Sequence, residues 1–232
     1  MGVAIAKGKY ITFLDDDDLY APNYLKNAFE SLNKNPQITT LFMAVSWFGS
    51  RSEPAQQNYD NAMNTVLINA KGTEVSINTL QFDENLFYAL LQSIPMAFQR
   101  HITKNQHLQQ IGLYLNTLLW DCDWALRASI NGSCGLLLDG LYLQRTAGQG
   151  YSSKPNRRLE HLLSNLEIKK QLHPNKQTKP IHIKQLNLAI IQTGEDLTWE
   201  YISQKKGLKA VSTMLNTFRY SLSILQIKFL LL

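Results

Sequence analysis

The chain has 232 residues, of which 44% are hydrophobic and 18% are charged, a composition that can bury a core and excludes a disordered polypeptide. Its formal net charge of +5 favours anionic partners without identifying them. Cys122 and Cys134 have no C-x-x-C spacing, so we expect no disulfide scaffold and a cytoplasmic protein. No segment reaches the ~20 uninterrupted apolar residues that a membrane-spanning helix needs.

The first two thirds of the chain predict alternating strands and helices. The run "KYITFLD" at residues 9–15 is typical of a strand buried on both faces. An amphipathic helix is expected over residues 21–36, with Pro22 in its first turn. The following elements are expected as a strand (37–48), a loop (49–63), a weaker strand (64–69), a helix (82–91), a strand (94–99), a helix from Asp121 to Gly132 and a strand (134–145). Such alternation indicates an α/β domain.

The sequence changes character after Lys154, where basic and amphipathic segments predict helices as far as the C-terminus. We therefore expect an α/β domain over residues 1–153 and a helical appendage over residues 154–232. Two interpretations of the appendage remain open. Its helices pack on the domain, or their basic and apolar residues rest on an anionic membrane surface.

Four consecutive aspartates, Asp15 to Asp18, directly follow the first predicted strand. Adjacent carboxylates repel one another unless a cation lies among them, and the end of a buried α/β strand is where such sheets bind ligands. Mg²⁺ and Mn²⁺ commonly pair one or two protein carboxylates with substrate phosphates. In an extended segment Asp15 and Asp17 share one side while Asp16 points elsewhere, which predicts a metal-bridged diphosphate at Asp15 and Asp17. Asp18 is either a further ligand or the cap of the following helix.

The surroundings of these aspartates resemble glycosyltransferase family 2. Residues 1–25, "MGVAIAKGKYITFLDDDDLYAPNYL", are similar to the family stretch whose D-x-D element binds the diphosphate of a nucleotide sugar through a divalent metal. The resemblance implies that Asp15 and Asp17 hold Mn²⁺ or Mg²⁺. It also implies an incomplete GT-A-type, Rossmann-like mixed sheet with flanking helices.

A second element, "WDCDWALRAS" at residues 120–129, resembles the family's E-D-x-D-x-x-L-R segment. The resemblance places the catalytic base at Asp121, for which capping of the following helix is the other interpretation. A neighbouring Asp123 and the aromatic Trp120 are both expected to raise the pKa of Asp121.

The resemblance assigns binding of the nucleotide sugar or of the acceptor to four further residues, namely Asp16, Trp120, Arg100 and Arg145. Trp120 stands where the family usually has Glu, which removes one carboxylate beside the base. Arg145 either contacts phosphate or pairs with solvent, and the sequence leaves both alternatives open.

The activity that the resemblance implies is inverting, metal-dependent transfer of a sugar from a nucleotide-sugar donor, UDP-type, to a saccharide or lipid-linked acceptor. Asp121 would accept the proton of the acceptor hydroxyl. The resemblance suggests that the reaction belongs to cell-surface polysaccharide assembly, and the protein could lie peripherally on the inner membrane face. The alternative is a non-catalytic remnant or interaction module that retains part of the scaffold. The sequence contains no nucleic-acid-binding signature, so we expect no nucleic-acid partner.

Members of this family carry a nucleotide-binding half ahead of the D-x-D strand. Met1 aligns with a residue just before that strand, so the sequence begins inside the family's fold. We therefore expect a truncated reading frame or one piece of a split gene, shorter than the family by roughly 60 residues or more. The first strand would then have an open apolar edge. On this expectation the chain alone binds UDP-sugars poorly.

Overall fold

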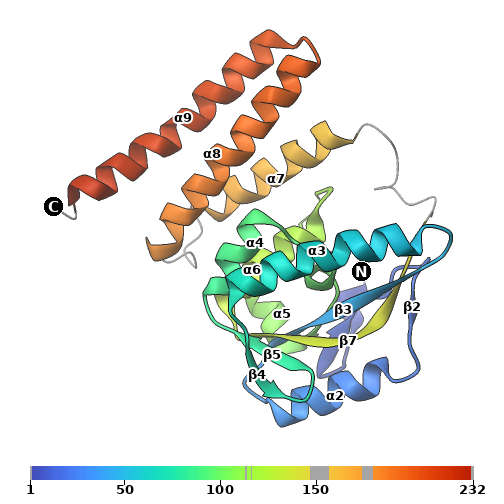
Figure 1. Ribbon diagram of the computed structural model, residues 1–232. Coiled ribbons are helices and arrows are strands. Elements are labelled where there is room, and N and C mark those ends of the chain that lie inside the picture. The colour runs from blue at the N-terminus through green and yellow to red at the C-terminus, as the bar shows by residue number, and fades with distance from the viewer. Residues whose placement is uncertain (1, 113, 116, 147–156, 174–179, 231–232) are drawn as a thin grey trace. The chain divides into compact units, whose positions relative to one another are not determined.

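The computed structural model describes residues 2–112, 114–115, 117–146, 157–173 and 180–230 (Figure 1). The chain separates into two compact units. The first comprises residues 1–115 and 120–153, and the second comprises residues 116–119 and 154–232.

A mixed sheet forms the centre of the first unit (Figure 1). Its strands are β1 (Tyr10–Thr12), β2 (Leu19–Tyr20), β3 (Thr40–Phe48), β4 (Thr73–Ser76), β5 (Thr79–Phe82), β6 (His101–Lys104) and β7 (Cys134–Arg145). They lie in the order β1-β6-β3-β7-β5-β4, and β2 pairs with β7 outside that order. The pair β3–β7 is parallel, while the other pairs are antiparallel.

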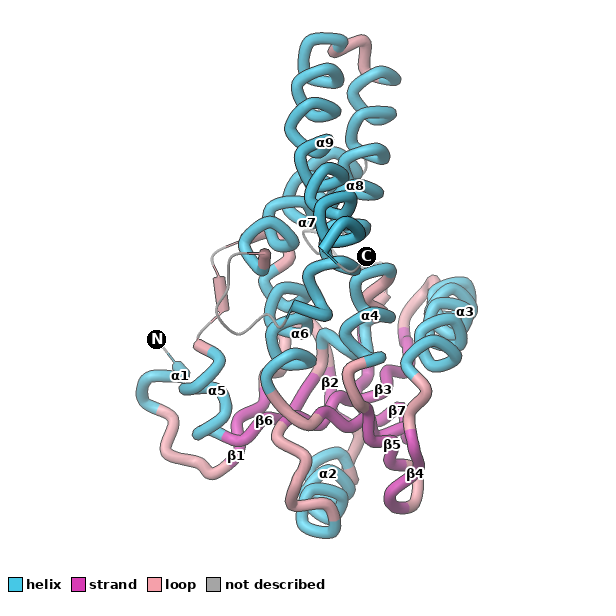
Figure 2. The backbone as a smooth tube through the Cα atoms, turned by 90° about the vertical axis from the view of Figure 1, so that its left-hand side faces the viewer, coloured by secondary structure: helices cyan, strands magenta, loops and turns pink. Residues whose placement is uncertain are grey.

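Helices cover both faces of this sheet. They are α1 (Gly2–Ile5), α2 (Tyr24–Lys34), α3 (Ser52–Ala70), α4 (Asn85–Gln92), the 3₁₀ turn η1 (Met96–Gln99), α5 (Asn105–Ile111) and α6 (Trp120–Asn131). Figure 2 shows α2 on one face of the sheet and α3, α4 and α6 on the other. The core between these layers contains fully buried side chains such as Phe42, Phe87 and Trp124. This arrangement confirms the predicted α/β fold class.

The first strand differs from its prediction. β1 is three residues long, hydrogen-bonds to β6 and forms one end of the sheet. Only Ile11 of this strand is buried, so burial on both faces was wrong. The apolar run predicted a longer strand because Phe13 and Leu14 are apolar, although both follow the end of β1.

The loop and weak strand predicted over residues 49–69 were also wrong, because α3 occupies almost all of this stretch. Its Asn- and Gln-rich sequence is typical of a loop. Tyr59, Met63, Val66 and Ala70 nevertheless recur at helical spacing, and all four are buried. Pro54 lies in the first turn of the helix, where a missing N–H removes no intrahelical hydrogen bond.

Two smaller corrections concern the region around residues 94–104 and the helix α2. The strand predicted over residues 94–99 is the turn η1, and the strand β6 follows it at His101. α2 begins at Tyr24, two residues after Pro22, and it buries Tyr24 and Ser31 while Phe29 is exposed. The buried side of α2 is therefore rotated away from Phe29 and towards the polar Ser31, relative to the side expected from periodicity.

The second unit consists of the helices α7 (Arg158–Leu172), α8 (Pro180–Ser203) and α9 (Gly207–Leu230), which confirms the helical tail. α8 and α9 lie side by side as a hairpin (Figure 1). Lys169 of α7 donates a hydrogen bond from Nζ to Oγ1 of Thr193 in α8 at 2.8 Å. Within the described part of the chain, every helix is too short or too polar to cross a membrane.

Candidate functional site

The four aspartates form a turn between β1 and β2. The backbone N–H of Asp18 donates to the carbonyl of Asp15 at 3.2 Å, so the extended conformation expected for this run was wrong. The turn gives the carboxylates different environments. Asp16 is exposed, Asp15 and Asp17 are partly exposed, and Asp18 is buried.

A buried arginine, Arg100, lies at the centre of the acidic cluster. Its Nη2 is 2.8 Å from Oδ2 of Asp15 and 3.7 Å from Oδ2 of Asp18. Its Nη1 is 4.0 Å from Oδ2 of Asp121. One guanidinium therefore faces three carboxylates, which leaves an excess of negative charge that favours a further cation. Asp15 is the most accessible of the three, with its side chain 39% exposed.

Two residues of β7 hold this arginine in place. The amide oxygen of Gln144 accepts hydrogen bonds from Nε of Arg100 at 3.2 Å and from Nη2 at 2.9 Å. The ring of Tyr142 lies 5.0 Å from the guanidinium carbon, a cation–π contact. Tyr142 and Gln144 are two residues apart in a strand, so both side chains lie on the same face of the sheet.

The same strand fixes the aspartate turn. The hydroxyl of Tyr142 donates to Oδ2 of Asp18 at 3.0 Å and accepts from the backbone N–H of Asp15 at 3.3 Å. Asp18 also accepts from the backbone N–H of Arg145 at 2.9 Å. Nε of Arg145 donates to the carbonyl of Asp17 at 2.7 Å. Asp18 thus anchors the turn, and it does not cap α2.

The predicted base, Asp121, lies in the first turn of α6 with its side chain 15% exposed. Burial raises its pKa, while the backbone N–H of Cys122 and the charge of Arg100 oppose the rise. Burial, and not the neighbouring Asp123, is therefore the main cause of the raised pKa of Asp121. Asp123 is itself buried and accepts hydrogen bonds from Arg127 at 2.6 and 2.9 Å.

An aromatic cluster connects the aspartate turn with the start of α6. Tyr114 contacts the ring of Phe13 edge-on at 5.0 Å and the ring of Trp120 at 4.9 Å. The Tyr114 hydroxyl is 2.7 Å from Nε2 of His101, and His101 stacks on Trp124 at 4.0 Å. Burial lowers the pKa of His101 to about 3, so this ring is neutral and acts as packing.

The structure therefore brings some of the predicted residues together and separates the roles of others. Asp15, Arg100 and Asp121 meet around one guanidinium, whereas Asp16 points into solvent. Arg145 is bound to the backbone of the aspartate turn. Sequence reasoning missed Tyr142 and Gln144, for which the strand alternation in "LYLQR" was the available signal. It also missed the anchoring role of Asp18.

The residues of the acidic cluster fit a cation held jointly with a substrate. Across the described residues, no group of three or more His, Cys, Asp and Glu side chains is placed to hold a metal ion alone. Mg²⁺ usually takes one or two carboxylates plus substrate phosphates, and the partly exposed Asp15 and Asp17 supply such oxygens beside an uncompensated negative charge.

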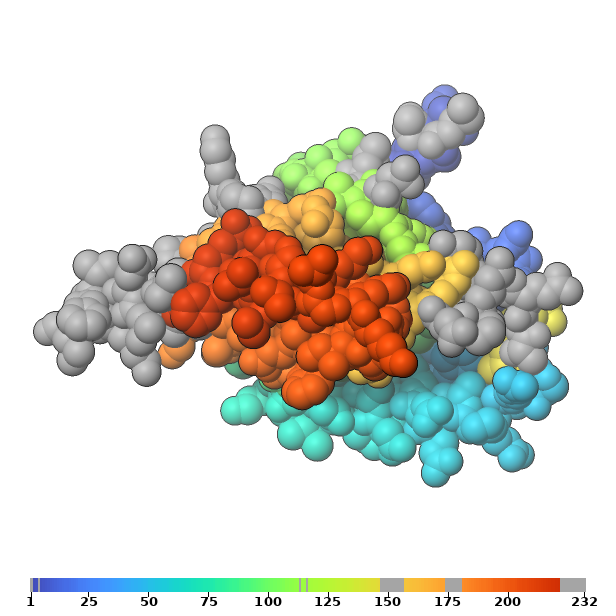
Figure 3. Space-filling view, turned by 90° about the horizontal axis from the view of Figure 1, so that it is seen from above, coloured from blue at the N-terminus to red at the C-terminus, as the bar shows by residue number. Residues whose placement is uncertain are grey.

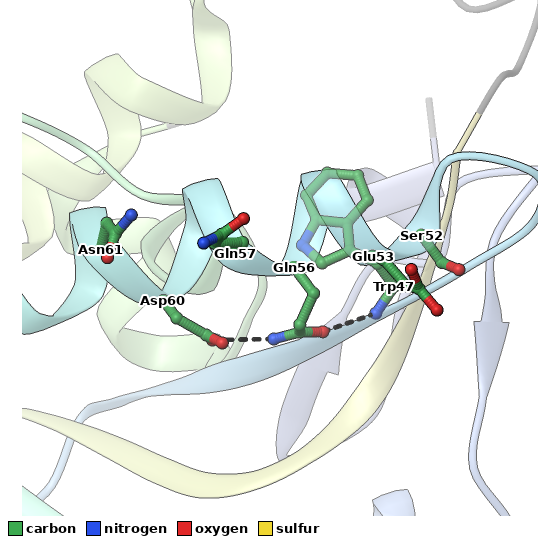
Figure 4. A pocket seen from close by; sticks show the side chains of 7 residues that line it. All are labelled: Trp47, Ser52, Glu53, Gln56, Gln57, Asp60 and Asn61. Atoms are coloured by element: carbon green, nitrogen blue, oxygen red, sulfur yellow. Dashed lines mark hydrogen bonds between the residues drawn. The ribbon is translucent and has the colours of Figure 1, made fainter.

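A hollow of about 600 Å³ lies elsewhere, along α3 and the end of β3 (Figure 4). Its lining combines the ring of Trp47 with polar side chains such as Gln56 and Asp60. Gln56 accepts from the backbone N–H of Trp47 at 3.1 Å and donates to Asp60 at 2.8 Å. None of the predicted site residues lines this hollow, so its size alone does not identify the functional site.

In a comparison with protein families, the model of glycosyl transferase family 2 matches residues 1–93. Residues 1–93 are therefore similar to glycosyl transferase family 2. The recognition made from the sequence is confirmed over these residues, which contain the aspartate turn. Among curated proteins, none matches the chain significantly.

Two similar solved structures support a glycosyltransferase fold of the GT-A type. They are the crystal structures of S. aureus TarS 1-349, one of them in complex with UDP-GlcNAc. The identities are 14% and 16%, and the TM-score is 0.58 for each. The match covers 93% of this chain but only 58% and 57% of those chains. At this level of identity the likeness is one of fold.

Proposed function

We propose that the protein is an inverting, metal-dependent glycosyltransferase that moves a sugar from a nucleotide-sugar donor to a saccharide or lipid-linked acceptor. The observation that carries this proposal is the position of Arg100, whose guanidinium contacts both Asp15 and Asp121. The carboxylate assigned to the metal and the carboxylate assigned to the base therefore border the same site.

Asp15 and Asp17 would hold Mn²⁺ or Mg²⁺ together with the donor diphosphate. When bound, the metal neutralises the charge that develops on the departing diphosphate. Arg100 supplies a second, permanent positive charge at the same place. Gln144 and Tyr142 fix the position of that charge before substrate binds, which limits the reorganisation that the transition state requires.

Asp121 would accept the proton of the acceptor hydroxyl. Its burial raises the pKa, which makes the carboxylate a better proton acceptor when it is ionised. The third carboxylate near Arg100, Asp18, is held by the hydroxyl of Tyr142 and the backbone of Arg145. It is poorly placed to act as a nucleophile, which supports direct displacement with inversion.

The donor is proposed to be of the UDP type, since the similar TarS structure was solved in complex with UDP-GlcNAc. We place the reaction in cell-surface polysaccharide assembly on the cytoplasmic side of the membrane. Asp16 and Trp120 would border the donor or the acceptor, because Asp16 lies in the aspartate turn and Trp120 directly precedes Asp121.

Release of UDP from UDP-sugars tests this proposal. It is measured with Mn²⁺ on the full chain. Wild-type release that falls by about 10²-fold or more in Asp121→Asn supports the proposal. Asp60→Asn, on the exposed surface of α3, is the matched control. No release by the wild type would instead favour a non-catalytic remnant that retains the scaffold.

A further inference from the structure

One side of α9 presents an apolar surface to solvent. Its side chains are between 52% and 90% exposed, and they belong to Leu208, Val211, Met214, Leu215 and Phe218. We call this set the α9 face. Figure 3 draws the described residues of α8 and α9 as atoms, in orange and red.

The α9 face is distinct from the side that packs on α8. Among residues 207–221 of α9, whose side chains the structure describes, the buried ones are Ala210, Thr217 and Tyr220. With 100° per residue, their positions cluster about 130° away from the α9 face around the helix axis. Polar exposed residues such as Ser212 and Asn216 occupy the remaining strip. The helical hairpin therefore forms without the α9 face, which is left free for another partner.

Positive charge accompanies this surface. Residues 154–232 contain 13 Lys and Arg but five Asp and Glu, whereas residues 1–153 contain 10 and 13. From residue 201 to the C-terminus there are five Lys and Arg and no acidic residue. Lys205 and Lys206 directly precede α9, Lys209 lies in its first turn, and all three are exposed. Nζ of Lys209 is 5.9 Å from the ring of Tyr201 in α8. An exposed apolar strip on a helix whose N-terminal end carries basic residues is complementary to the surface of an anionic bilayer.

We propose that α9 lies on an anionic lipid surface, with the α9 face buried among acyl chains and Lys205, Lys206 and Lys209 against the headgroups. This inference goes beyond the proposed sugar transfer and does not depend on it. It assigns to the second unit the role of holding the protein at a membrane, where lipid-linked substrates are found.

Self-association is the competing use of the same surface, because Leu208, Val211, Leu215 and Phe218 follow the alternating spacing of three and four residues that is typical of coiled coils. The charges argue against it. A second α9 packed in parallel would bring the same positive charges together, and α9 contains no acidic residue to pair with them.

Co-sedimentation with vesicles tests the proposal on the full chain. Vesicles of phosphatidylcholine are compared with vesicles that contain about one third phosphatidylglycerol, and we expect strong binding to the second kind only. Leu215→Gln with Phe218→Gln should weaken binding about tenfold or more. Replacing Lys205, Lys206 and Lys209 by Gln should weaken it on the order of a hundredfold.

Ser212→Gln with Asn216→Gln, on the polar strip of the same helix, is the matched control and should leave binding unchanged. All these positions are at least partly exposed, and circular dichroism checks that the variants fold. Absent binding, or equal binding to both kinds of vesicle, overturns the proposal. So does a wild-type dimer in light scattering that Leu215→Gln with Phe218→Gln converts to a monomer without any vesicle binding. Loss of UDP release is scored separately and has no bearing on this result.

Discussion

Nη1 of Arg100 lies 4.0 Å from Oδ2 of Asp121, while Nη2 of the same guanidinium lies 2.8 Å from Asp15. The two acidic residues come from segments more than 100 positions apart, the aspartate turn after β1 and the first turn of α6. Removing the guanidinium should therefore affect stability as well as activity, since it would leave several carboxylates close together without a counter-charge.

Arg100→Met should lower the free energy of unfolding by about 3–5 kcal/mol, because it leaves buried carboxylates uncompensated. Urea denaturation at neutral pH measures this change. Arg51→Met removes a positive charge from an exposed position and should change stability by less than about 0.5 kcal/mol. Equal effects of the two substitutions would show that Arg100 does not act through the cluster.

The rate of sugar transfer should depend on the ionisation of Asp121. Burial raises the pKa of this carboxyl above its ordinary value, and only the ionised form accepts a proton. The rate constant kcat should therefore fall as the pH decreases through that raised pKa. In Arg100→Met the fall should begin at higher pH, because the positive charge that favours the ionised form is lost. A pH profile that is identical in both proteins would contradict this assignment.

Tyr142→Phe removes the hydroxyl that bonds to Asp18 and to the backbone of Asp15. We expect a loss of about 1–3 kcal/mol in the free energy of unfolding, since a buried carboxylate loses a donor. Tyr10→Phe, in which the removed hydroxyl belongs to a partly exposed residue of β1, is the control. Thermal denaturation of both variants gives the comparison, and a neutral Tyr142→Phe would remove the anchoring role from Tyr142.

Gly194 allows α8 and α9 to approach closely. A Cβ atom at this position would meet the side chain of Thr217 in α9, with Oγ1 at only 2.8 Å. Gly194→Ala should therefore destabilise the second unit by about 1–3 kcal/mol in spite of the better helix propensity of Ala. Gly207→Ala meets nothing within 4 Å and should be neutral or slightly stabilising. Thermal melts followed by the circular dichroism of the helices separate these outcomes.

Lys169 is buried between α7 and α8, and burial lowers its pKa to about 8. As the pH rises from about 8 towards the ordinary value of 10.5, the folded protein releases this proton before the unfolded chain does. Stability should therefore increase over this window. Lys169→Met should be more stable than wild type at pH 7, by roughly 3 kcal/mol for the charge alone, and the difference should shrink as the pH rises. Lys184→Met, at an exposed position, should show no such trend.

Much of the architecture could be predicted from local pattern. The strand β3, the helices α4 and α6 and the long strand β7 lie close to their expected positions, because each carries a continuous apolar run or a clear helical period. α3 was missed because polar residues fill its exposed side, and its buried side holds only four residues. The edge position of β1 depends on pairing between distant segments, which periodicity does not contain.

The candidate site divides in the same way. Asp15 and Asp121 were identified from motifs, and Arg100 from its place between them. Gln144 hydrogen-bonds to Arg100 and Tyr142 to Asp18, so both bonds join β7 to residues more than 40 positions away. They arise only once β7 lies beside β3 and β2. Asp18 was expected to cap a helix or bind a ligand. Its anchoring role was missed because its partners on β7, Tyr142 and Arg145, lie more than 120 positions away in the sequence.

We propose that Asp15 and Asp121 act on one substrate from two sides of a single site. The most direct test is Mn²⁺-dependent release of UDP from a UDP-sugar by the wild-type protein, compared with Asp15→Asn and Asp121→Asn. We predict that Asp15→Asn raises the Mn²⁺ concentration needed for half-maximal release. Asp121→Asn should abolish transfer while donor binding is retained. Full transfer by Asp121→Asn, with the fold intact, would contradict the account.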